Sequence, residues 1–327
     1  MYLLLAIFLC LGINTNAYSP WSYNGTTPLL KDLLIGRCYQ YQIIDSIERE
    51  DDMQVHVNCT TDLWNLFKKA FENKDACKTT ITEEDYLPVI NKVANRKQLK
   101  DKAMFWSGTR TVVHDFTHVN TEYITLEDMF TGYVANDLRW CGSVTEGINY
   151  DYCNKSCPDP TGPYWNLVSR QLAEKAANTV YVMVNGTAKG RNTAYYNGST
   201  FGRIELPTLG STGNVTHLRI LVVFDLDEEP KEKCGEKSLL QMVEDAKKHK
   251  IPKISCTDNP KMVEAILCAK YPHAKQCQKK DDKGPWKTVS HALIGVASLF
   301  LVIIIILLVF ICKKRKFLAS NYQSENA

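Results

Sequence analysis

An uninterrupted apolar run stands near each end of the 327-residue chain, and between these runs the apolar positions follow helical or strand spacing. The C-terminal run, Ala292 to Ile311, has twenty residues and no charge. At about 1.5 Å per residue it is long enough for the roughly 30 Å of hydrocarbon in a bilayer. Four basic residues, Lys313 to Lys316, follow after Cys312 and mark the cytoplasmic side. The pattern predicts a transmembrane helix over residues 292–312 and a cytoplasmic tail over residues 313–327.

A removed GPI-anchor signal is the alternative interpretation of this run. Such a signal normally ends on its hydrophobic tail, whereas sixteen mostly polar residues, Cys312 to Ala327, follow the run here. A retained type I span is therefore favoured, and release of the protein by a GPI-cleaving phospholipase would overturn it.

The N-terminal apolar run, Tyr2 to Leu11, precedes a site of small residues at Thr15 to Ala17. This order is typical of a secretory signal peptide, here over residues 1–17, although no Lys or Arg precedes the run. An uncleaved anchor is the alternative, but ten apolar residues are too few to cross a bilayer. We expect a single-pass type I protein of the cell membrane or of a secretory-pathway organelle, with its ectodomain extracellular or luminal.

Helical spacing dominates residues 18–177, which we interpret as a mostly helical lobe of the ectodomain. Behind a predicted cap at Thr61 and Asp62 runs one apolar stripe, composed of Leu63, Phe67, Ala70 and Phe71. A capping box is predicted at Thr82 with Asp85.

Two further helices are predicted in the same lobe. Thr125 and Asp128 form a capping box that opens a helix with Met129, Phe130 and Tyr133 on one side. Pro163 suits the first turn of the other helix, whose buried stripe consists of Trp165, Val168, Leu172 and Ala176.

Residues 178–278 change in character and read as an α/β lobe. The β-rich runs are Thr179–Val184, Phe201–Leu206 and Leu218–Phe224, with helical patterns at Glu236–Lys250 and Asn259–Lys270. A short strand at residues 103–107, centred on Met104 to Trp106, is expected to join their sheet. The predicted fold is α+β with a small parallel sheet, followed by a charged stalk over residues 279–291.

Ten cysteines lie between the two terminal runs, at positions 38, 59, 77, 141, 153, 157, 234, 256, 268 and 277. An even number in a secreted segment indicates a disulfide framework. A zinc site is the alternative, but there is no CxxC pair and Cys153 with Cys157 has no matching partner pair, so no metal is expected. N-glycosylation sequons begin at Asn24, Asn58, Asn154, Asn185, Asn197 and Asn214.

The charge excludes one class of function. The net charge of +3 is too small to indicate a nucleic-acid partner, and part of it belongs to the tail. Because the chain contains no GxSxG, HExxH or P-loop motif, composition and spacing stop at a secreted, disulfide-rich ectodomain.

Six local motifs extend this description, and they run in order over most of residues 37–277. They are Met104–Gly108, Tyr123–Asp128 continuing to Gly132 and Tyr133, Leu138–Gly142, Trp165–Arg170, Val182–Gly186 and Ser199–Glu205. Together they resemble the signature of the ADP-ribosyl cyclase / NAD glycohydrolase family. Their residues are most similar to those of the molluscan branch. The resemblance implies cleavage of the bond between nicotinamide and ribose in NAD.

The resemblance gives Glu205 the catalytic role. The transition state of such a cleavage resembles an oxocarbenium ion, so a carboxylate beside the ribose stabilises the positive charge that develops. The residue pattern agrees in part, because a Glu inside a β-rich run needs a reason to be there. An outward-facing strand residue is the alternative for a Glu taken alone.

Two tryptophans match the substrate-positioning indoles of the family, Trp106 and Trp165. The nicotinamide ring of NAD is positively charged, so an aromatic face attracts it as well as packs against it; core burial is the alternative. Ser169 lies one helical turn after Trp165, on the same face, and resembles a phosphate-binding serine. The resemblance also assigns Ser107, Thr200 and Phe201 to substrate binding.

Glu127 and Asn136 match two residues that contact nicotinamide. As a residue in the first turn of a capped helix, Glu127 could equally be stabilised by the helix dipole alone. Nine residues on a straight helix place these side chains on opposite faces. If both line one pocket, the helix must end or bend between them, and Gly132 is the expected place.

Departures from the family pattern are also visible. Some relatives carry an Arg after Trp-Ser that helps to hold phosphate, but Gly108 stands there, so Arg110 or backbone donors would have to substitute. The resemblance implies the disulfides Cys38–Cys59, Cys77–Cys157, Cys141–Cys153, Cys234–Cys256 and Cys268–Cys277, a pattern that spacing alone could not choose. An additional mammalian pair, near Lys100 and Ala177, is absent.

The expected activity is that of a membrane-anchored ecto-enzyme with NAD as its substrate, NADP as a second candidate and no cofactor. Molluscan relatives carry a Phe five residues before the catalytic Glu and mammalian relatives, mainly hydrolases, carry a Thr; here Thr200 stands there. We therefore expect mainly ADP-ribose and nicotinamide, with some cyclic ADP-ribose. A predominant cyclase and a catalytically weak surface receptor are the alternatives, and a homodimer is one of the oligomeric states left open.

Overall fold

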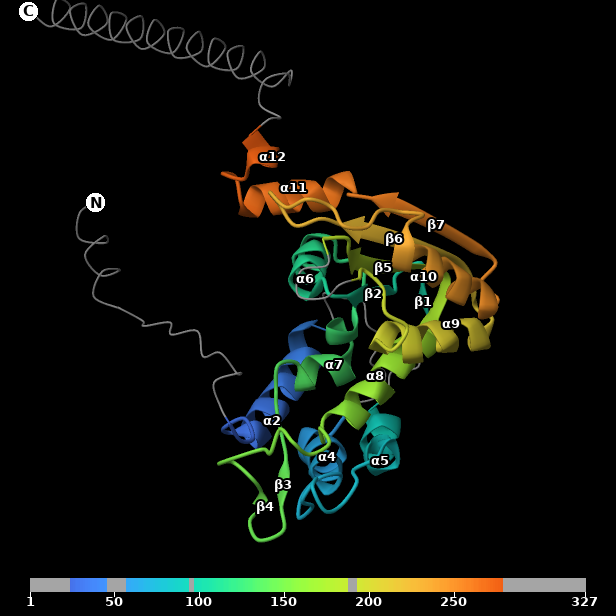
Figure 1. Ribbon diagram of the computed structural model, residues 1–327. Coiled ribbons are helices and arrows are strands. Elements are labelled where there is room, and N and C mark those ends of the chain that lie inside the picture. Colours follow the sequence, from blue (N-terminus) through green and yellow to red (C-terminus); the bar gives the residue numbers. More distant parts are fainter. Residues whose placement is uncertain (1–23, 46–56, 94–96, 188–192, 279–327) are drawn as a thin grey trace, which may run out of the picture. The chain divides into compact units, whose positions relative to one another are not determined.

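The computed structural model describes residues 24–45, 57–93, 97–187 and 193–278 (Figure 1). The predicted signal peptide, stalk, transmembrane helix and tail lie outside these ranges. Within them, no helix is long and apolar enough to cross a membrane. The chain divides into two compact units, residues 1–269 and 270–327. The described part of the second unit contains α12, Lys275–Gln278.

The first unit contains a parallel sheet of five strands among the described residues. The strands are β1 Leu99–Lys100, β2 Met104–Ser107, β5 Ala176–Asn185, β6 Val215–Val223 and β7 Lys253–Asp258. β5 lies at the centre, because β1 and β2 pair with one side of it and β6 with the other, and β7 follows β6. The strands predicted near Met104, Thr179 and Leu218 are confirmed, whereas β1 and β7 were not predicted.

Alternating side chains on the strands give the sheet two buried faces. On β5, Val180, Val182 and Val184 join the large core, and Met183 between them joins a second cluster. That second cluster is covered by α6 Arg110–Val119 and α11 Lys261–Lys270. The large core is covered by α8 Gly162–Lys175, α9 Leu206–Thr212 and α10 Lys237–Lys248.

The segment predicted as a strand at Phe201–Leu206 is helical, so this prediction is wrong. Residues Phe201–Glu205 form a π-helical turn, η5, which continues directly into α9. The Ser199 hydroxyl accepts a hydrogen bond from the Gly202 N–H at 3.1 Å and so caps the turn. Pro207 stands in the first turn of α9, where its missing N–H costs nothing. The apolar Phe, Ile and Leu therefore mark a buried helix rather than a strand.

The remaining helices pack around an aromatic core. They are α2 Leu30–Gln40, η2 Tyr41–Asp45, η3 Cys59–Trp64, α4 Asn65–Lys69, α5 Glu83–Val93, η4 Leu126–Asp128 and α7 Phe130–Ala135. Phe67, Tyr86, Trp140 and Tyr164 meet with ring centroids between 4.8 and 6.1 Å apart. A hairpin of β3 Gly142–Ser143 and β4 Gly147–Ile148 completes the described elements.

The caps of these helices follow the sequence only in part. The N–H of Thr82 donates to Asp85 at 2.8 Å, as predicted for the start of α5. The cap of the Leu63 stripe was predicted at Thr61 and Asp62, but it is the Asn58 side chain, which accepts from the N–H groups of Thr60 and Thr61. Asn58 has the extended backbone that a cap requires.

Disulfides connect cysteines throughout the described chain. The predicted pairs Cys38–Cys59, Cys77–Cys157, Cys141–Cys153 and Cys234–Cys256 are confirmed. Cys268 and Cys277, the residues of the fifth predicted pair, are both disulfide-bonded as well. All ten cysteines of the predicted framework are therefore oxidised.

Candidate active site

Glu205 ends the η5 turn and is only 5% exposed. The turn that carries it is tightly built, because a Cβ added at Gly202 would come within 2.8 Å of the Asn197 backbone. Glycine at that position lets the chain fold back on itself just before the carboxylate. The same motif that identified Glu205 in the sequence is thus a structural requirement of its turn.

The environment of Glu205 disfavours its charged form and raises its pKa to about 8. Burial is the largest cause, because a carboxylate loses its hydration there. A hydrogen bond with Ser169 acts in the opposite direction, and the negative charge of Glu127 raises the pKa further. A strongly perturbed buried carboxyl with a second carboxylate nearby is typical of functional sites.

Ser169 and Trp165 come from one face of α8. They lie one turn apart, and Ser169 is 1% exposed while Trp165 is half-buried. The helix begins with Pro163 in its first turn, as predicted. Arg203 of η5 donates to Asn166 of α8 at 3.1 Å, which fixes the two elements against each other. The bond between Ser169 and Glu205 is therefore part of a rigid contact.

Glu127 lies in the η4 turn, which the predicted capping box closes. The N–H of Thr125 and its hydroxyl donate to the Asp128 carboxylate at 2.8 and 2.7 Å. The turn ends at Met129, whose backbone is extended, and α7 starts one residue later. The predicted break between Glu127 and Asn136 is confirmed, but its position at Gly132 is wrong. Gly132 is needed for another reason: a Cβ there would lie 1.9 Å from the Leu126 carbonyl oxygen.

Trp106 reaches Glu127 from strand β2. Its indole Nε1 donates to the Glu127 Oε2 at 3.3 Å. The two segments meet because the strand and the loop before η4 are joined: the Met104 N–H donates to the Ile124 carbonyl oxygen at 2.9 Å. Residues 21 positions apart in the sequence are thereby brought into contact. The structure thus connects Trp106, Glu127, Glu205 and Ser169 in one chain of interactions.

The other predicted residues lie around this group. Ser107 ends β2 and is 8% exposed. Phe201 is 1% exposed, with its ring 5.9 Å from that of Phe105, so its side chain belongs to the core. Thr200 is exposed at the start of η5. Asn136 caps the end of α7.

Arg110 was considered in the sequence as a substitute for a phosphate-binding arginine. In the structure its guanidinium donates to the Asn136 Oδ1 at 2.8 Å and pairs with Asp137 at 2.7 Å. Arg37 holds the same segment by donating to the Asn136 carbonyl oxygen at 2.5 Å. Arg110 thus orients Asn136, one of the predicted nicotinamide contacts.

His114 also belongs to the site, and sequence reasoning missed it. It follows Arg110 by one turn of α6, and its Nε2 lies 3.7 Å from the Glu127 Oε1. Its ring centroid lies 6.5 Å from that of Trp106. Nothing in the spacing of His114 from Glu127 indicates this contact, because it depends on the loop that returns to β2.

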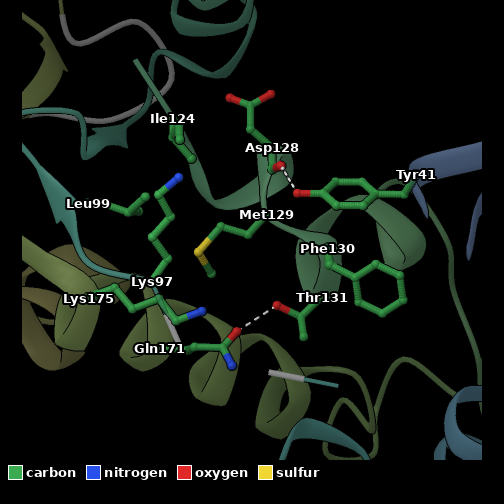
Figure 2. A pocket seen from close by; sticks show the side chains of 10 residues that line it. All are labelled: Tyr41, Lys97, Leu99, Ile124, Asp128, Met129, Phe130, Thr131, Gln171 and Lys175. Carbon is green, nitrogen blue, oxygen red and sulfur yellow. Dashed lines mark hydrogen bonds between the residues drawn. The ribbon is translucent and has the colours of Figure 1, made fainter. Parts of the chain in front are cut away.

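A pocket lies beside the turn that carries Glu127 and is lined in part by Asp128 of that turn (Figure 2). Its lining includes Asp128, Thr131 and Gln171, and Figure 2 shows Thr131 bonded to Gln171 at 2.8 Å. None of the predicted substrate-binding residues lines this pocket. It is therefore separate from the group around Glu205.

The arrangement around Glu205 suits a cationic substrate better than a metal ion. The two partly buried indoles offer aromatic faces to an organic cation, and a cation beside Glu205 would favour the charged form of its carboxyl group. Within the described ranges, no group of three or more His, Cys, Asp or Glu side chains could hold a metal ion.

Comparison with known proteins agrees with this chemistry. A family model described as ADP-ribosyl cyclase matches residues 27–277. The ADP-ribosyl cyclase/cyclic ADP-ribose hydrolase of Aplysia californica is 34% identical over 277 residues, which is 82% of this chain and 93% of the relative. ADP-ribosyl cyclase/cyclic ADP-ribose hydrolase 1 of Rattus norvegicus is 32% identical over 264 residues, 79% and 82% of the two chains.

Solved structures show the same relationship. The crystal structure of Aplysia cyclase complexed with substrate NGD and product cGDPR matches with a TM-score of 0.70 at 34% identity, and covers 77% of this chain and 98% of its own. The apo structure of porcine CD38 matches with a TM-score of 0.61 at 30% identity, covering 73% and 99%.

Proposed function

The chain belongs to the ADP-ribosyl cyclase family, and we propose that it is an ecto-enzyme that cleaves the nicotinamide–ribose bond of NAD. Water then adds to the ribosyl cation, which gives ADP-ribose, nicotinamide and a proton. Attack by the adenine of the same molecule gives cyclic ADP-ribose instead. NAD is the substrate in this scheme, with NADP as a second candidate, and no cofactor or metal takes part.

The observation that carries the proposal is the state of Glu205. Burial and the nearby Glu127 raise its pKa to about 8, so its carboxyl group is mostly protonated at neutral pH until a cation lies beside it. A cationic nicotinamide ring or ribosyl cation favours the charged form of a neighbouring carboxyl. Glu205 would therefore ionise as positive charge arrives and would stabilise that charge without a hydration shell to reorganise.

The surrounding residues would orient the substrate. The Trp106 and Trp165 indoles offer faces to the positively charged nicotinamide ring. Glu127, held by the Trp106 Nε1, would accept a hydrogen bond from the nicotinamide amide, with Asn136 as a second contact. Ser169, which bonds Glu205, stands where a phosphate oxygen of the substrate could replace that bond.

We further propose that hydrolysis exceeds cyclisation. Folding the adenine back onto the ribose requires an apolar wall and the exclusion of water. Thr200 is exposed at the start of the η5 turn and provides a hydroxyl rather than an aromatic ring. Water therefore competes with adenine for the cation.

The proposed location is a cell membrane or secretory-pathway membrane, with the enzyme domain outside the cell or in a lumen. The disulfide framework supports an oxidising compartment. Five of the six sequon asparagines are exposed, at positions 24, 58, 154, 197 and 214. Asn185 differs, since its Nδ2 lies 3.4 Å from Asp225. Protease protection in sealed vesicles, together with phospholipase and glycosidase treatment, would test the topology.

The activity is tested with the full-length protein in washed membranes. NAD is supplied with and without EDTA, and the products are separated by chromatography for the wild type and Glu205→Gln. Glu232→Gln is the matched control, because Glu232 is also buried, at 1% exposure, but caps α10 through Ser238. Nicotinamide release that Glu205→Gln abolishes and EDTA spares would support the proposal. No release from the wild type would contradict it and favour the receptor alternative, and predominant cyclic ADP-ribose would favour the cyclase alternative.

A further inference from the structure

Helix α6 turns one face toward the leaving-group side of the proposed site. Gly108, with a positive φ of 72°, turns the chain at the end of β2, and α6 begins two residues later. Arg110 and His114 lie one turn apart on the helix and so share a face. Arg110 bonds Asn136 at 2.8 Å and His114 approaches Glu127. The two predicted nicotinamide contacts are thus each met by a basic residue of the same helix.

The His114 Nε2 is an unusual atom in this site. It is buried and has no hydrogen-bond partner among the described residues. Native proteins rarely leave a buried side-chain nitrogen unpaired, because its lost hydration is not compensated. Its nearest charged neighbour is the Glu127 Oε1, at 3.7 Å, which lies just beyond hydrogen-bonding distance. A shift of less than about 1 Å would make the bond.

The other oxygen of the same carboxylate is already held. The Trp106 Nε1 donates to the Glu127 Oε2 at 3.3 Å. Trp106 and His114 therefore flank Glu127, with one ring nitrogen facing each carboxylate oxygen. Both rings come from one unit, since β2 is paired to β5 and α6 packs on the sheet through Val113 and Phe116.

We propose that His114 is a positioning residue for Glu127, closing on its Oε1 when substrate enters. This rests on the proposed NAD cleavage, in which Glu127 accepts a hydrogen bond from the nicotinamide amide. A carboxylate fixed by two donors keeps its remaining lone pairs aimed at the substrate and stays an acceptor. His114 itself touches no reacting atom. Its loss would act through Glu127 and would alter substrate affinity and product ratio together.

Three substitutions separate this role from simple packing. His114→Gln keeps a nitrogen donor three bonds from Cβ, as Nε2 is, whereas the amide of His114→Asn is one bond shorter. His114→Phe keeps the ring shape and loses both nitrogens. We expect kcat/KM for NAD to fall about tenfold in the Phe and Asn variants and to be largely restored in the Gln variant. His118→Phe, an exposed residue one turn further along α6, is the matched control and should stay within about twofold.

A double-mutant cycle tests the dependence on Glu127. We expect Glu127→Gln and His114→Phe to change the ratio of cyclic ADP-ribose to ADP-ribose in the same direction. In the Glu127→Gln background, His114→Phe should have less than about a twofold further effect. Thermal unfolding of each variant reports on folding separately, and the Gln and Asn variants compare two polar side chains should the Phe variant fail to fold.

The outcomes distinguish this inference from the proposed function. An active wild type with unchanged His114 variants would overturn the role of His114 alone. The same follows from multiplicative effects in the cycle, or from equal activity of the Gln and Asn variants. A wild type that releases no nicotinamide would overturn the proposed function, and the role of His114 with it.

Discussion

Two clusters built around a tryptophan handle their buried polar groups in opposite ways. Trp140 is fully buried, and its Nε1 donates to the Tyr86 hydroxyl at 2.7 Å. That hydroxyl donates in turn to the Pro160 carbonyl oxygen at 2.9 Å. Every step of this chain ends on a partner, as expected for a cluster that stabilises the fold.

The cluster at Trp106 is satisfied only in part. Its indole bond to Glu127 is longer, at 3.3 Å, and His114 leaves a buried nitrogen without a partner. Glu205 is held where its charged form is disfavoured. Such groups lower the stability of the fold, and a substrate that met them would supply the missing partners. The difference shows that burial alone does not identify a site. Buried polar groups that lack a hydrogen-bond partner, or whose charged form is disfavoured, do identify one.

The largest expected effect is that of Glu205→Gln on catalysis. Loss of the charge that stabilises the ribosyl cation should lower kcat about a thousandfold. Because the wild-type carboxyl is buried at a cost, the same substitution should preserve or raise the melting temperature. Steady-state nicotinamide release and thermal unfolding of the same preparation check both. Glu232→Gln should do the reverse, with activity kept and stability lowered, and equal behaviour of the two variants would remove the contrast.

Exchanging each tryptophan for phenylalanine breaks the comparison more directly. Trp140→Phe removes a fully buried ring system and leaves Tyr86 with one partner fewer, so we expect a loss of about 2–4 kcal/mol in the free energy of unfolding. Trp106→Phe should lower kcat/KM about tenfold with little change in stability. Denaturant unfolding and kinetics per folded molecule measure the pair. A Trp140 variant with impaired catalysis at full folding would show that the clusters are not independent.

Much of this contrast was accessible from sequence, but not all of the fold was. The spacing of Thr179–Val184 predicted β5, because a strand buried on both faces is rich in branched apolar residues. β7 escaped prediction because Lys253–Asp258 is a partly exposed strand with few apolar residues. The segment Phe201–Leu206 was predicted as a strand because its apolar residues suit a strand as well as they suit a buried helix. The capping Ser199 and Pro207 were the signals for a helix there.

For the site, motif resemblance named the residues while tertiary contacts decided how they act. Trp106 and Glu127 were both predicted, but their hydrogen bond depends on the pairing of Met104 with Ile124. The place where the chain bends, at Met129 rather than Gly132, follows from a short turn that the capping box closes. His114 carried no sequence signal, because only the folded loop brings α6 to Glu127.

A smaller effect sharpens the electrostatic side of the comparison. The pKa of Glu205 is raised from 4.5 to about 8, so between these values the native state holds a proton that the unfolded state releases. The unfolding free energy contributed by Glu205 is therefore highest below pH 4.5 and falls as pH rises toward 8. Glu205→Gln removes this dependence.

The stability advantage of Glu205→Gln over the wild type should thus grow across that window, by on the order of 2–4 kcal/mol. Unfolding of both proteins at several pH values gives the difference, in which titration of the other groups cancels. Adding Glu127→Gln should shrink the advantage, because the Glu127 charge is one cause of the raised pKa. A stability advantage of Glu205→Gln that does not change with pH would contradict the raised pKa of the Glu205 carboxyl group.

The smallest expected effect concerns the step after nicotinamide has left. Thr200→Phe adds an aromatic wall at an exposed position five residues before Glu205, where the larger ring displaces no core side chain. We expect the ratio of cyclic ADP-ribose to ADP-ribose to rise about threefold to tenfold, because one added apolar contact is worth roughly 1 kcal/mol or slightly more. Chromatography at low conversion measures this ratio, and Thr193→Phe, at another exposed threonine of the same segment, is the control. Glu205→Gln should lower the yield of both products, whereas Thr200→Phe should only redistribute them. An unchanged ratio would therefore leave the cleavage chemistry intact and assign the choice between water and adenine to residues other than Thr200.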